Sequence, residues 1–112
     1  MGTPPDWLTP EDVAAYLDLP TADDDNLILS TAAIKASLER RRSDLWKGDP
    51  PVFTPDDGVK GGAVMWAAMV WQWRSSPSGP PGFGDETMVF DALGSRRAEI
   101  MRMVGWRRPV AV

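Results

Sequence analysis

The segment from Asp23 to Trp46 constrains the fold more than any other part of this chain. Its apolar residues recur at steps of three and four, which is the period of one helix face. The stripe consists of Leu27, Thr31, Ile34, Leu38 and Leu45. Three aspartates open the segment, where the helix dipole is positive, and Gly48–Pro51 stops it. The pattern predicts one helix over this range, about 36 Å long at about 1.5 Å per residue.

A second helix is predicted over Pro10–Asp18. Thr9 suits the N-cap, Pro10 the first helical position and Asp12 the third, which is a variant of the capping box. Thr54–Asp57 repeats the same letters almost unchanged. The next helix is therefore expected to begin at Pro55 and to run to Arg74.

The last helix is predicted over Ala92–Val104, with Asp91 or Ser95 as its cap and Gly105 ending it. Two loops join the helices, Gly48–Thr54 and the Gly/Pro-rich Ser75–Thr87. The expected fold is therefore all-α. It is one domain over 1–112, a small bundle of about four helices with a long Gly/Pro loop, an extended arm at 1–8 and a docking tail at 105–112.

The helix expected over 55–74 is apolar nearly all round. Its stripe consists of Val59, Ala63, Trp66, Val70 and Trp73, and its other faces carry Met65, Ala67, Ala68, Met69 and Trp71. Such a helix is central to a bundle or covered by a partner. Because Trp and Met are favoured at interfaces, we expect part of this surface to face another subunit, with a purely intrachain core as the alternative. Gly61 and Gly62 would let a neighbouring helix approach closely.

The composition excludes several kinds of chemistry. The 112 residues include no Cys and no His, so a zinc site, a Cys or Ser/His nucleophile pair and a histidine base are excluded. Consecutive aspartates such as Asp23–Asp25 do not alternate as calcium-loop ligands do, so helix capping explains them better. The most apolar stretch, Ala63–Trp73, is shorter than the ~20 residues of a membrane span. We expect a soluble protein that is not an enzyme and has no cofactor, no metal and no membrane contact.

The net charge of −4 is distributed unevenly along the chain. Residues 1–26 contain seven acidic side chains and no Lys or Arg, whereas residues 94–112 contain five Arg and one Glu. A chain that is acidic at one end and basic at the other suits head-to-tail contacts with charged neighbours. The alternative is that both charged ends are simply solvated.

Two arginine-rich stretches are candidates for binding. Trp106–Pro109 combines an aromatic ring, two guanidinium groups and a rigid proline, and Trp and Arg most often dominate binding energy. This tail is therefore expected to dock onto a partner. Arg40–Arg42 span about 300° of a helix at about 100° per residue, so they do not form one flat patch. They are either a solvated helix end or inter-subunit ion-pair partners.

The opening WLTPEDVAAYLDLP resembles the first helix of excisionase-type or MerR-like helix-turn-helix domains. That resemblance implies a small DNA-binding regulator whose next helix enters the major groove. The residues that follow here are TADDDNL, whose carboxylates would repel phosphates. The regulator is therefore kept as the alternative function.

A second resemblance covers nearly the whole chain. It rests on the order of LTPEDVAAYLDLP, DDDNLILSTAAIKASLERRRSDLW, an apolar helix ending WQWRSSPSG, a Gly/Pro loop and a terminal helix with a basic tail. This order is similar to the head-to-tail connector, or adaptor, proteins of tailed bacteriophages. The resemblance implies a structural virion protein, made in the host bacterial cytoplasm, that forms a ring of generally twelve subunits under the portal protein. The ring would extend the DNA channel, pass double-stranded DNA without sequence-specific binding, and receive stopper or tail-completion proteins.

The resemblance also implies roles for particular residues. The tail would dock on the portal through Trp106, Arg107, Arg108, Pro109 and Val110. Candidates for subunit contacts are Arg40, Arg41, Arg42, Trp66, Trp71, Trp73 and Phe83. Candidates for facing the channel are Asp23, Asp24, Asp25, Asp56 and Asp57, because a lumen through which DNA slides should not grip phosphates.

Overall fold

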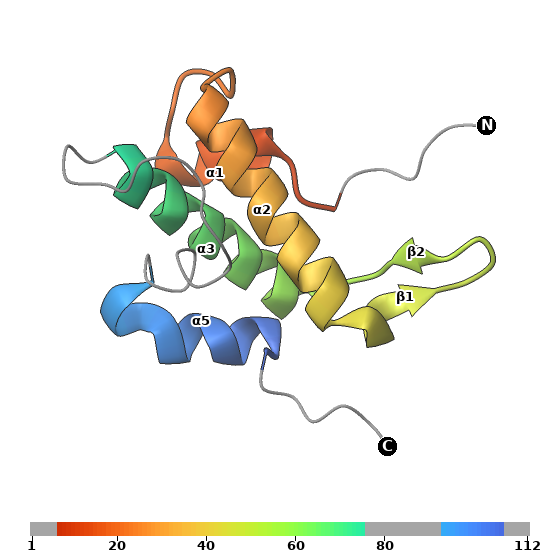
Figure 1. Ribbon diagram of the computed structural model, residues 1–112. Coiled ribbons are helices and arrows are strands. Elements are labelled where there is room, and N and C mark those ends of the chain that lie inside the picture. Colours follow the sequence, from red (N-terminus) through yellow and green to blue (C-terminus); the bar gives the residue numbers. More distant parts are fainter. Residues whose placement is uncertain (1–6, 76–92, 107–112) are drawn as a thin grey trace.

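The computed structural model describes residues 7–75 and 93–106, and these form a small helical bundle (Figure 1). Its helices are α1 (Pro10–Leu17), α2 (Asp25–Arg41), α3 (Asp57–Ser75) and α5 (Arg97–Val104), with short 3-10 turns at Ser43–Leu45 and Gly94–Arg96. Strands β1 (Trp46–Lys47) and β2 (Val52–Phe53) form the one small sheet of the described residues. The predicted all-α class with about four helices is confirmed.

Helix α3 lies at the centre, in contact with α1, α2 and α5 (Figure 1). This position explains why it is apolar nearly all round, because three neighbours cover its faces. Its buried apolar residues are Val59, Ala63, Trp66, Ala67, Ala68 and Val70. Trp66 is the largest fully buried side chain of the described core. The intrachain-core alternative is therefore right for this part of α3.

The start of α1 matches the predicted capping box. The Thr9 hydroxyl accepts a hydrogen bond from the Asp12 N–H at 3.1 Å, and the Asp12 carboxylate accepts one from the Thr9 N–H at 3.1 Å. Leu8 before the cap and Val13 after it are both buried in the core. Because the cap fixes where α1 begins, it also fixes which of its residues face α3.

Helix α2 is shorter than predicted. It begins after Asp24, whose side chain accepts from the Leu27 N–H at 3.1 Å, and it ends at Arg41. The predicted stripe is buried at Leu27, Thr31, Ile34 and Leu38, but Leu45 belongs to the following 3-10 turn. The extension to Trp46 is wrong because Arg42 leaves the helical conformation, at φ −105° and ψ 52°, and its side chain points into the protein.

Helix α3 begins at Asp57, two residues after the predicted Pro55. Asp56 is its cap, with the side chain accepting from the Val59 N–H at 2.8 Å. Thr54 does not cap the helix, because its N–H and its hydroxyl both donate to the Leu45 carbonyl, at 2.8 and 2.7 Å. The Thr-Pro-Xaa-Asp sequence therefore has a different role in each of its two copies. Thr9 caps a helix, whereas Thr54 forms hydrogen bonds at the base of the hairpin.

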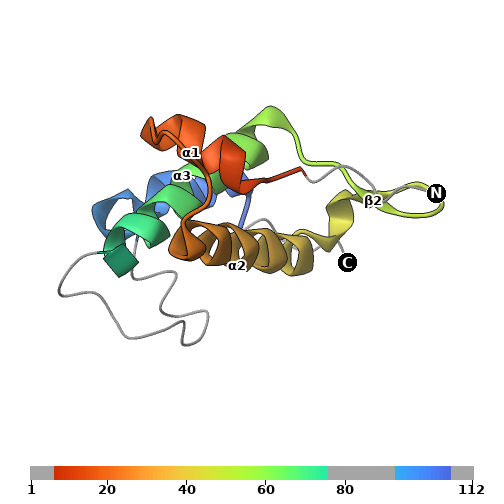
Figure 2. The ribbon, with the colours of Figure 1, turned by 90° about the horizontal axis from the view of Figure 1, so that it is seen from above.

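The segment predicted as a loop over Gly48–Thr54 is mostly an antiparallel hairpin. Trp46 pairs with Phe53 and Lys47 with Val52. The hairpin projects from the bundle in both views (Figures 1 and 2). Ring contacts hold its base. The Trp7 and Phe53 rings are tilted, with centroids 4.9 Å apart, and the Trp46 ring meets Phe53 edge-on, with centroids 5.4 Å apart.

The last helix also begins later than predicted. The described part starts at Leu93, a 3-10 turn covers Gly94–Arg96, and α5 starts at Arg97 without a side-chain cap, so Ser95 does not cap it. Gly105 ends α5 in the left-handed region at φ 69°, as predicted. Several predicted segments lie outside the described residues: the arm at 1–6, the Gly/Pro loop from 76 on, Asp91, Ala92 and the tail from 107.

The close crossing of α3 and α5 gives a testable prediction at Gly62. A Cβ there would lie 2.8 Å from Val104 Cγ1 and 2.9 Å from Met103 Cβ. We expect Gly62→Ala to lower the free energy of unfolding by about 1–3 kcal/mol through overpacking. At Gly61 the nearest atom, Met103 Cε, would be 3.6 Å from a new Cβ, so Gly61→Ala should stabilise by about 0.5–1 kcal/mol through helix propensity.

Urea unfolding of the two variants checks this difference in sign. Two variants that change stability equally would contradict the close crossing of α3 and α5 at Gly62.

Candidate functional site

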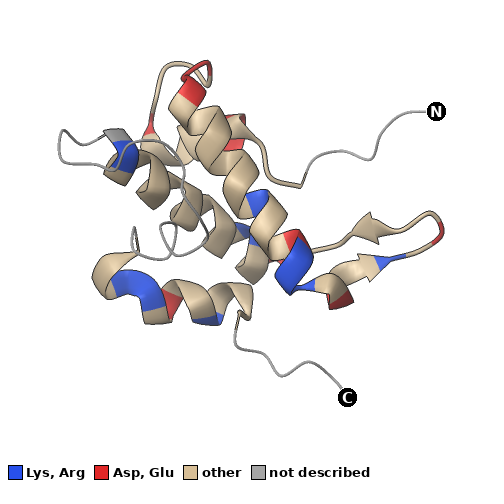
Figure 3. Cartoon of the chain, viewed as in Figure 1, with Lys and Arg blue, Asp and Glu red and all other residues tan. Residues whose placement is uncertain are grey.

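The connection between α1 and α2 forms an acidic surface at one end of the bundle (Figure 3). Asp18, Asp23 and Asp25 are exposed there. One turn further along α2, Ile28 and Leu29 are 42% and 49% exposed. We name the exposed set Asp23, Asp25, Ile28 and Leu29 the α2 head. It combines carboxylates with two aliphatic side chains that the bundle leaves uncovered.

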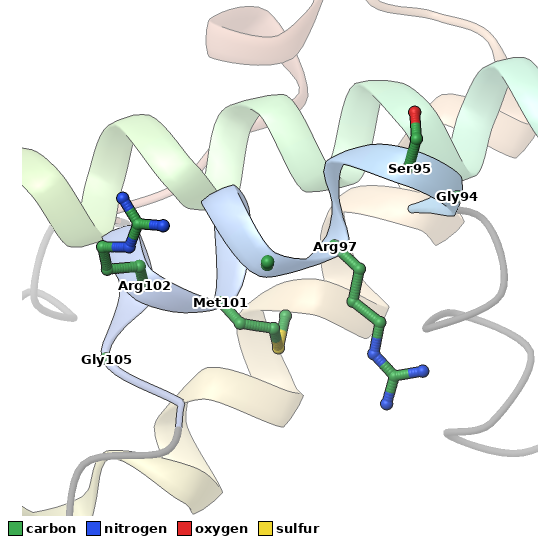
Figure 4. A pocket seen from close by; sticks show the side chains of 7 residues that line it. Gly94, Ser95, Arg97, Met101, Arg102 and Gly105 are labelled. Atoms are coloured by element: carbon green, nitrogen blue, oxygen red, sulfur yellow. The ribbon is translucent and has the colours of Figure 1, made fainter.

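A hollow of about 800 Å³ lies beside helix α5 and the 3-10 turn that precedes it (Figure 4). Its described lining residues are Gly94, Ser95, Arg97, Ala98, Met101, Arg102 and Gly105. Met101 lies between the two arginine side chains (Figure 4). The described lining of this α5 hollow therefore contains two guanidinium groups, apolar side chains and no carboxylate.

An ion pair joins the 3-10 turn at Gly94–Arg96 to α5. Arg96 binds Glu99, and the hydrogen bond to Glu99 raises the pKa of Arg96 above its ordinary value, with Tyr16 adding a smaller contribution. Glu99 is not among the described residues that line the hollow.

Arg42 joins the end of α2 to the end of α5. Its side chain is buried and donates to both carboxylate oxygens of Asp44 at 3.0 Å and to the Val104 carbonyl at 2.8 Å. The hydrogen bond to Asp44 raises the pKa of Arg42, which outweighs the lowering by burial. The expectation that Arg42 contacts another subunit is therefore wrong, because its guanidinium is used inside the chain.

Trp106 is packed on the bundle and is not part of an extended tail. Its ring meets the Trp66 ring edge-on, with centroids 5.5 Å apart and planes at 80°. The Arg41 guanidinium lies 5.4 Å from the Trp106 ring centre, and Arg41 Nε donates to the Trp106 carbonyl at 2.8 Å. Trp106 thus anchors the start of the tail, whereas Arg107–Val110 lie outside the described residues.

The remaining interface candidates differ in exposure. Trp66 has an exposed fraction of 0%, so its prediction as a subunit contact is wrong. Trp71 and Trp73 are half-buried, and Arg40 and Arg41 are exposed. Phe83 lies outside the described residues. The roles of the accessible candidates stay predictions.

The five aspartates predicted to face a channel are all exposed. Asp24 and Asp56 also cap α2 and α3, so their substitution would change stability as well as surface charge. Whether these side chains face a channel depends on how copies are arranged, so this role stays a prediction.

Some residues of these surfaces were not singled out from the sequence. Ile28 and Leu29 fall outside the buried stripe of α2, and this position in the sequence pattern could have predicted that they are exposed. The sequence pattern gave less indication that Arg97, Ala98 and Arg102 line a hollow, because that depends on how α5 packs.

Two further observations concern metal ligands and a second pocket. In the described ranges 7–75 and 93–106, no group of three or more Asp or Glu side chains is placed to hold a metal ion. A second, shallower pocket of about 400 Å³ is lined by Tyr16, Asp57, Lys60, Gly61, Val64 and Met65. What these surfaces offer is charge and apolar area, which suits binding.

Comparison with protein-family models, with curated proteins and with solved structures gives no match to this chain. None of the helices within the described residues has the length and apolar character needed to cross a membrane.

Proposed function

We propose that the protein is a structural component of a tailed-phage particle, a ring-forming adaptor between the portal and the tail-side proteins. The observation that supports this most is that the acidic α1–α2 connection and the arginine-bearing helix α5 lie on different sides of the bundle (Figure 3). Two different surfaces that attract each other give head-to-tail contacts, and such contacts close into rings when the rotation between neighbours allows it. The order of the sequence elements supports the same proposal.

In this proposal the ring, of about twelve copies as in the resembling family, sits at the head-to-tail interface of the virion. It docks on the portal through the tail that follows the anchored Trp106 and offers its far side to a stopper or tail-completion protein. Double-stranded DNA passes through the channel without base-specific contacts. The exposed Asp57 and the acidic α1–α2 connection are candidates for the channel wall, since carboxylates do not retain phosphates. No catalytic role is proposed.

The alternative function, a helix-turn-helix regulator, has weaker support. The helix after α1 is capped by Asp24, begins at Asp25 and exposes acidic and aliphatic side chains there. Proteins that bind DNA neutralise phosphates with Lys and Arg, so this end of α2 is unsuited to the major groove.

Native mass spectrometry of the purified chain, alone and mixed with the portal ring of the same phage, tests the adaptor proposal. We expect a complex of the portal with multiple copies of the chain, and we expect deletion of residues 107–112 to weaken it. Because Trp106 is retained, the deletion leaves the described bundle intact, and circular dichroism checks this. A chain that ignores the portal but binds duplex DNA in a salt-sensitive manner would instead favour the regulator.

A further inference from the structure

We propose that Arg41 is a positioning residue for the tail: it fixes the point at which residues 107–112 leave the bundle, so that they start from one place and one direction when they dock. This inference rests on the proposed function, because it concerns the same docking of the tail on the portal. It gives Arg41 a role within its own chain, where the sequence suggested a contact between subunits. The contacts that support it join the end of α2 to the end of α5 (Figure 1).

Trp106, the last described residue before the tail, is held through both its backbone and its ring. Its N–H donates to the Met101 carbonyl at 3.0 Å, and its carbonyl accepts from Arg41 Nε at 2.8 Å. Its ring contacts the Arg41 guanidinium, 5.4 Å from the ring centre, and meets the buried Trp66 ring edge-on. A guanidinium group near an aromatic ring is attracted to it. Both the position and the orientation of Trp106 are therefore fixed.

The two residues before Trp106 are tied to α2 as well. Gly105 turns the chain at φ 69°, and the Val104 carbonyl accepts from Arg42 at 2.8 Å. The Arg41 and Arg42 hydrogen bonds join residues 65 and 62 positions apart in the sequence. Chain ends usually fray unless such contacts tie them down. Two consecutive residues of α2 thus fasten the end of α5.

The two arginines differ in how far their removal would disturb the core. Arg42 is buried, whereas Arg41 is exposed and contacts α5 from outside. Removing the Arg41 side chain would therefore loosen Trp106 without opening the core. A segment that is already held in place loses less conformational freedom when it binds, so a loosened tail should bind more weakly. The expected result is weaker docking of a chain that is folded as before.

Arg41→Ala in the full chain tests this role, with Arg102→Ala as the matched control. Arg102 is also exposed and lies in the last turn of α5, but no hydrogen bond or ion pair joins its side chain to another described residue. We expect Arg41→Ala to raise the dissociation constant for the portal ring about tenfold. Arg102→Ala should leave it unchanged. Circular dichroism and urea unfolding check that both variants fold like the wild type.

Two further measurements separate positioning from a direct contact of Arg41 with the portal. In a chain that lacks residues 107–112 there is no tail to position, so Arg41→Ala should cause no further loss of portal affinity. Hydrogen exchange of the Trp106 amide, followed by NMR in the isolated chain, needs no partner. Because the end of α5 would open more often, we expect this exchange to be about tenfold faster in Arg41→Ala. Arg102→Ala should not change it.

Three outcomes would overturn the positioning role. They are an Arg41→Ala variant that binds the portal like the wild type, a further loss of affinity from Arg41→Ala in the shortened chain, and Trp106 exchange that Arg41→Ala does not accelerate. In all three cases the adaptor proposal stands as long as the wild-type chain binds the portal. A wild-type chain that ignores the portal would instead remove the adaptor proposal, and the positioning role would be lost with it.

Discussion

Gly105→Ala is expected to lower the free energy of unfolding by about 2–4 kcal/mol. The residue has φ 69°, a conformation that costs L side chains about 1–2 kcal/mol. A Cβ there would also overlap the Arg42 guanidinium, whose Cζ would be 3.2 Å away. Arg42 would have to move from Asp44 and the Val104 carbonyl, and its buried guanidinium would lose hydrogen bonds there. Urea unfolding monitored by tryptophan fluorescence measures the loss.

Gly94→Ala is the matched control for this prediction. Gly94 also has positive φ, 54°, but a Cβ there would meet no described atom within 4 Å. Gly94→Ala is therefore expected to lower the free energy of unfolding only through the positive φ, by about 1–2 kcal/mol. In an Arg42→Ala background, Gly105→Ala should cost no more than this term, because the overlapping group is gone. Equal effects of Gly105→Ala in both backgrounds would contradict the predicted overlap.

Trp66→Ala is expected to cost about 3–5 kcal/mol, the usual loss for truncating a fully buried Trp. The side chain has an exposed fraction of 0% and also supports the Trp106 ring. Such a loss is large for a small domain, whose total stability is about 5–15 kcal/mol. Thermal unfolding of the isolated chain, at a concentration where it does not assemble, measures it.

Trp46→Ala provides the comparison for Trp66→Ala. Trp46 is 41% exposed and contacts Phe53 at the hairpin base, so its truncation should cost about 1 kcal/mol. Comparing the two variants also distinguishes a role of Trp66 in the core from a role in an interface between chains. If Trp66→Ala left the isolated chain stable and only weakened assembly, the burial of Trp66 within the chain would be contradicted.

The features predicted correctly from the sequence depend on near neighbours. The capping box at Thr9 needs only Asp12, three residues away, and the buried stripe of α2 follows from helical period. Gly105 ends α5 because glycine adopts positive φ without strain. Each of these features can be judged from a few consecutive residues.

The errors arise where distant residues decide the local structure. Helix α2 ends at Arg41 because Arg42 turns inward to the Val104 carbonyl, 62 positions further along the chain. Thr54 fails to cap α3 because it donates to Leu45 in the hairpin. Helical propensity does not account for contacts between distant residues. The helices predicted from the sequence pattern are therefore longer than α2 and α3.

The candidate site could be predicted only in part for the same reason. The charge difference between the ends of the chain is visible in composition, and the described acidic α1–α2 connection lies apart from α5 in the fold. Which aliphatic residues stay uncovered depends on packing. Ile28 and Leu29 are exposed because α1 and α3 cover the opposite face of α2, and Trp66 is buried because three helices surround α3.

The projecting hairpin gives the molecule a natural attachment point for a visible marker. Its turn, residues 48–51, is exposed, while its base is fixed by the Trp7, Trp46 and Phe53 rings and by the Trp46 indole, which donates to the Glu39 carbonyl at 3.1 Å. A short peptide tag inserted in the turn would extend away from the core, since exposed loop tips tolerate insertion. Electron microscopy of any complex that contains the tagged chain would then show how the chain is oriented in it.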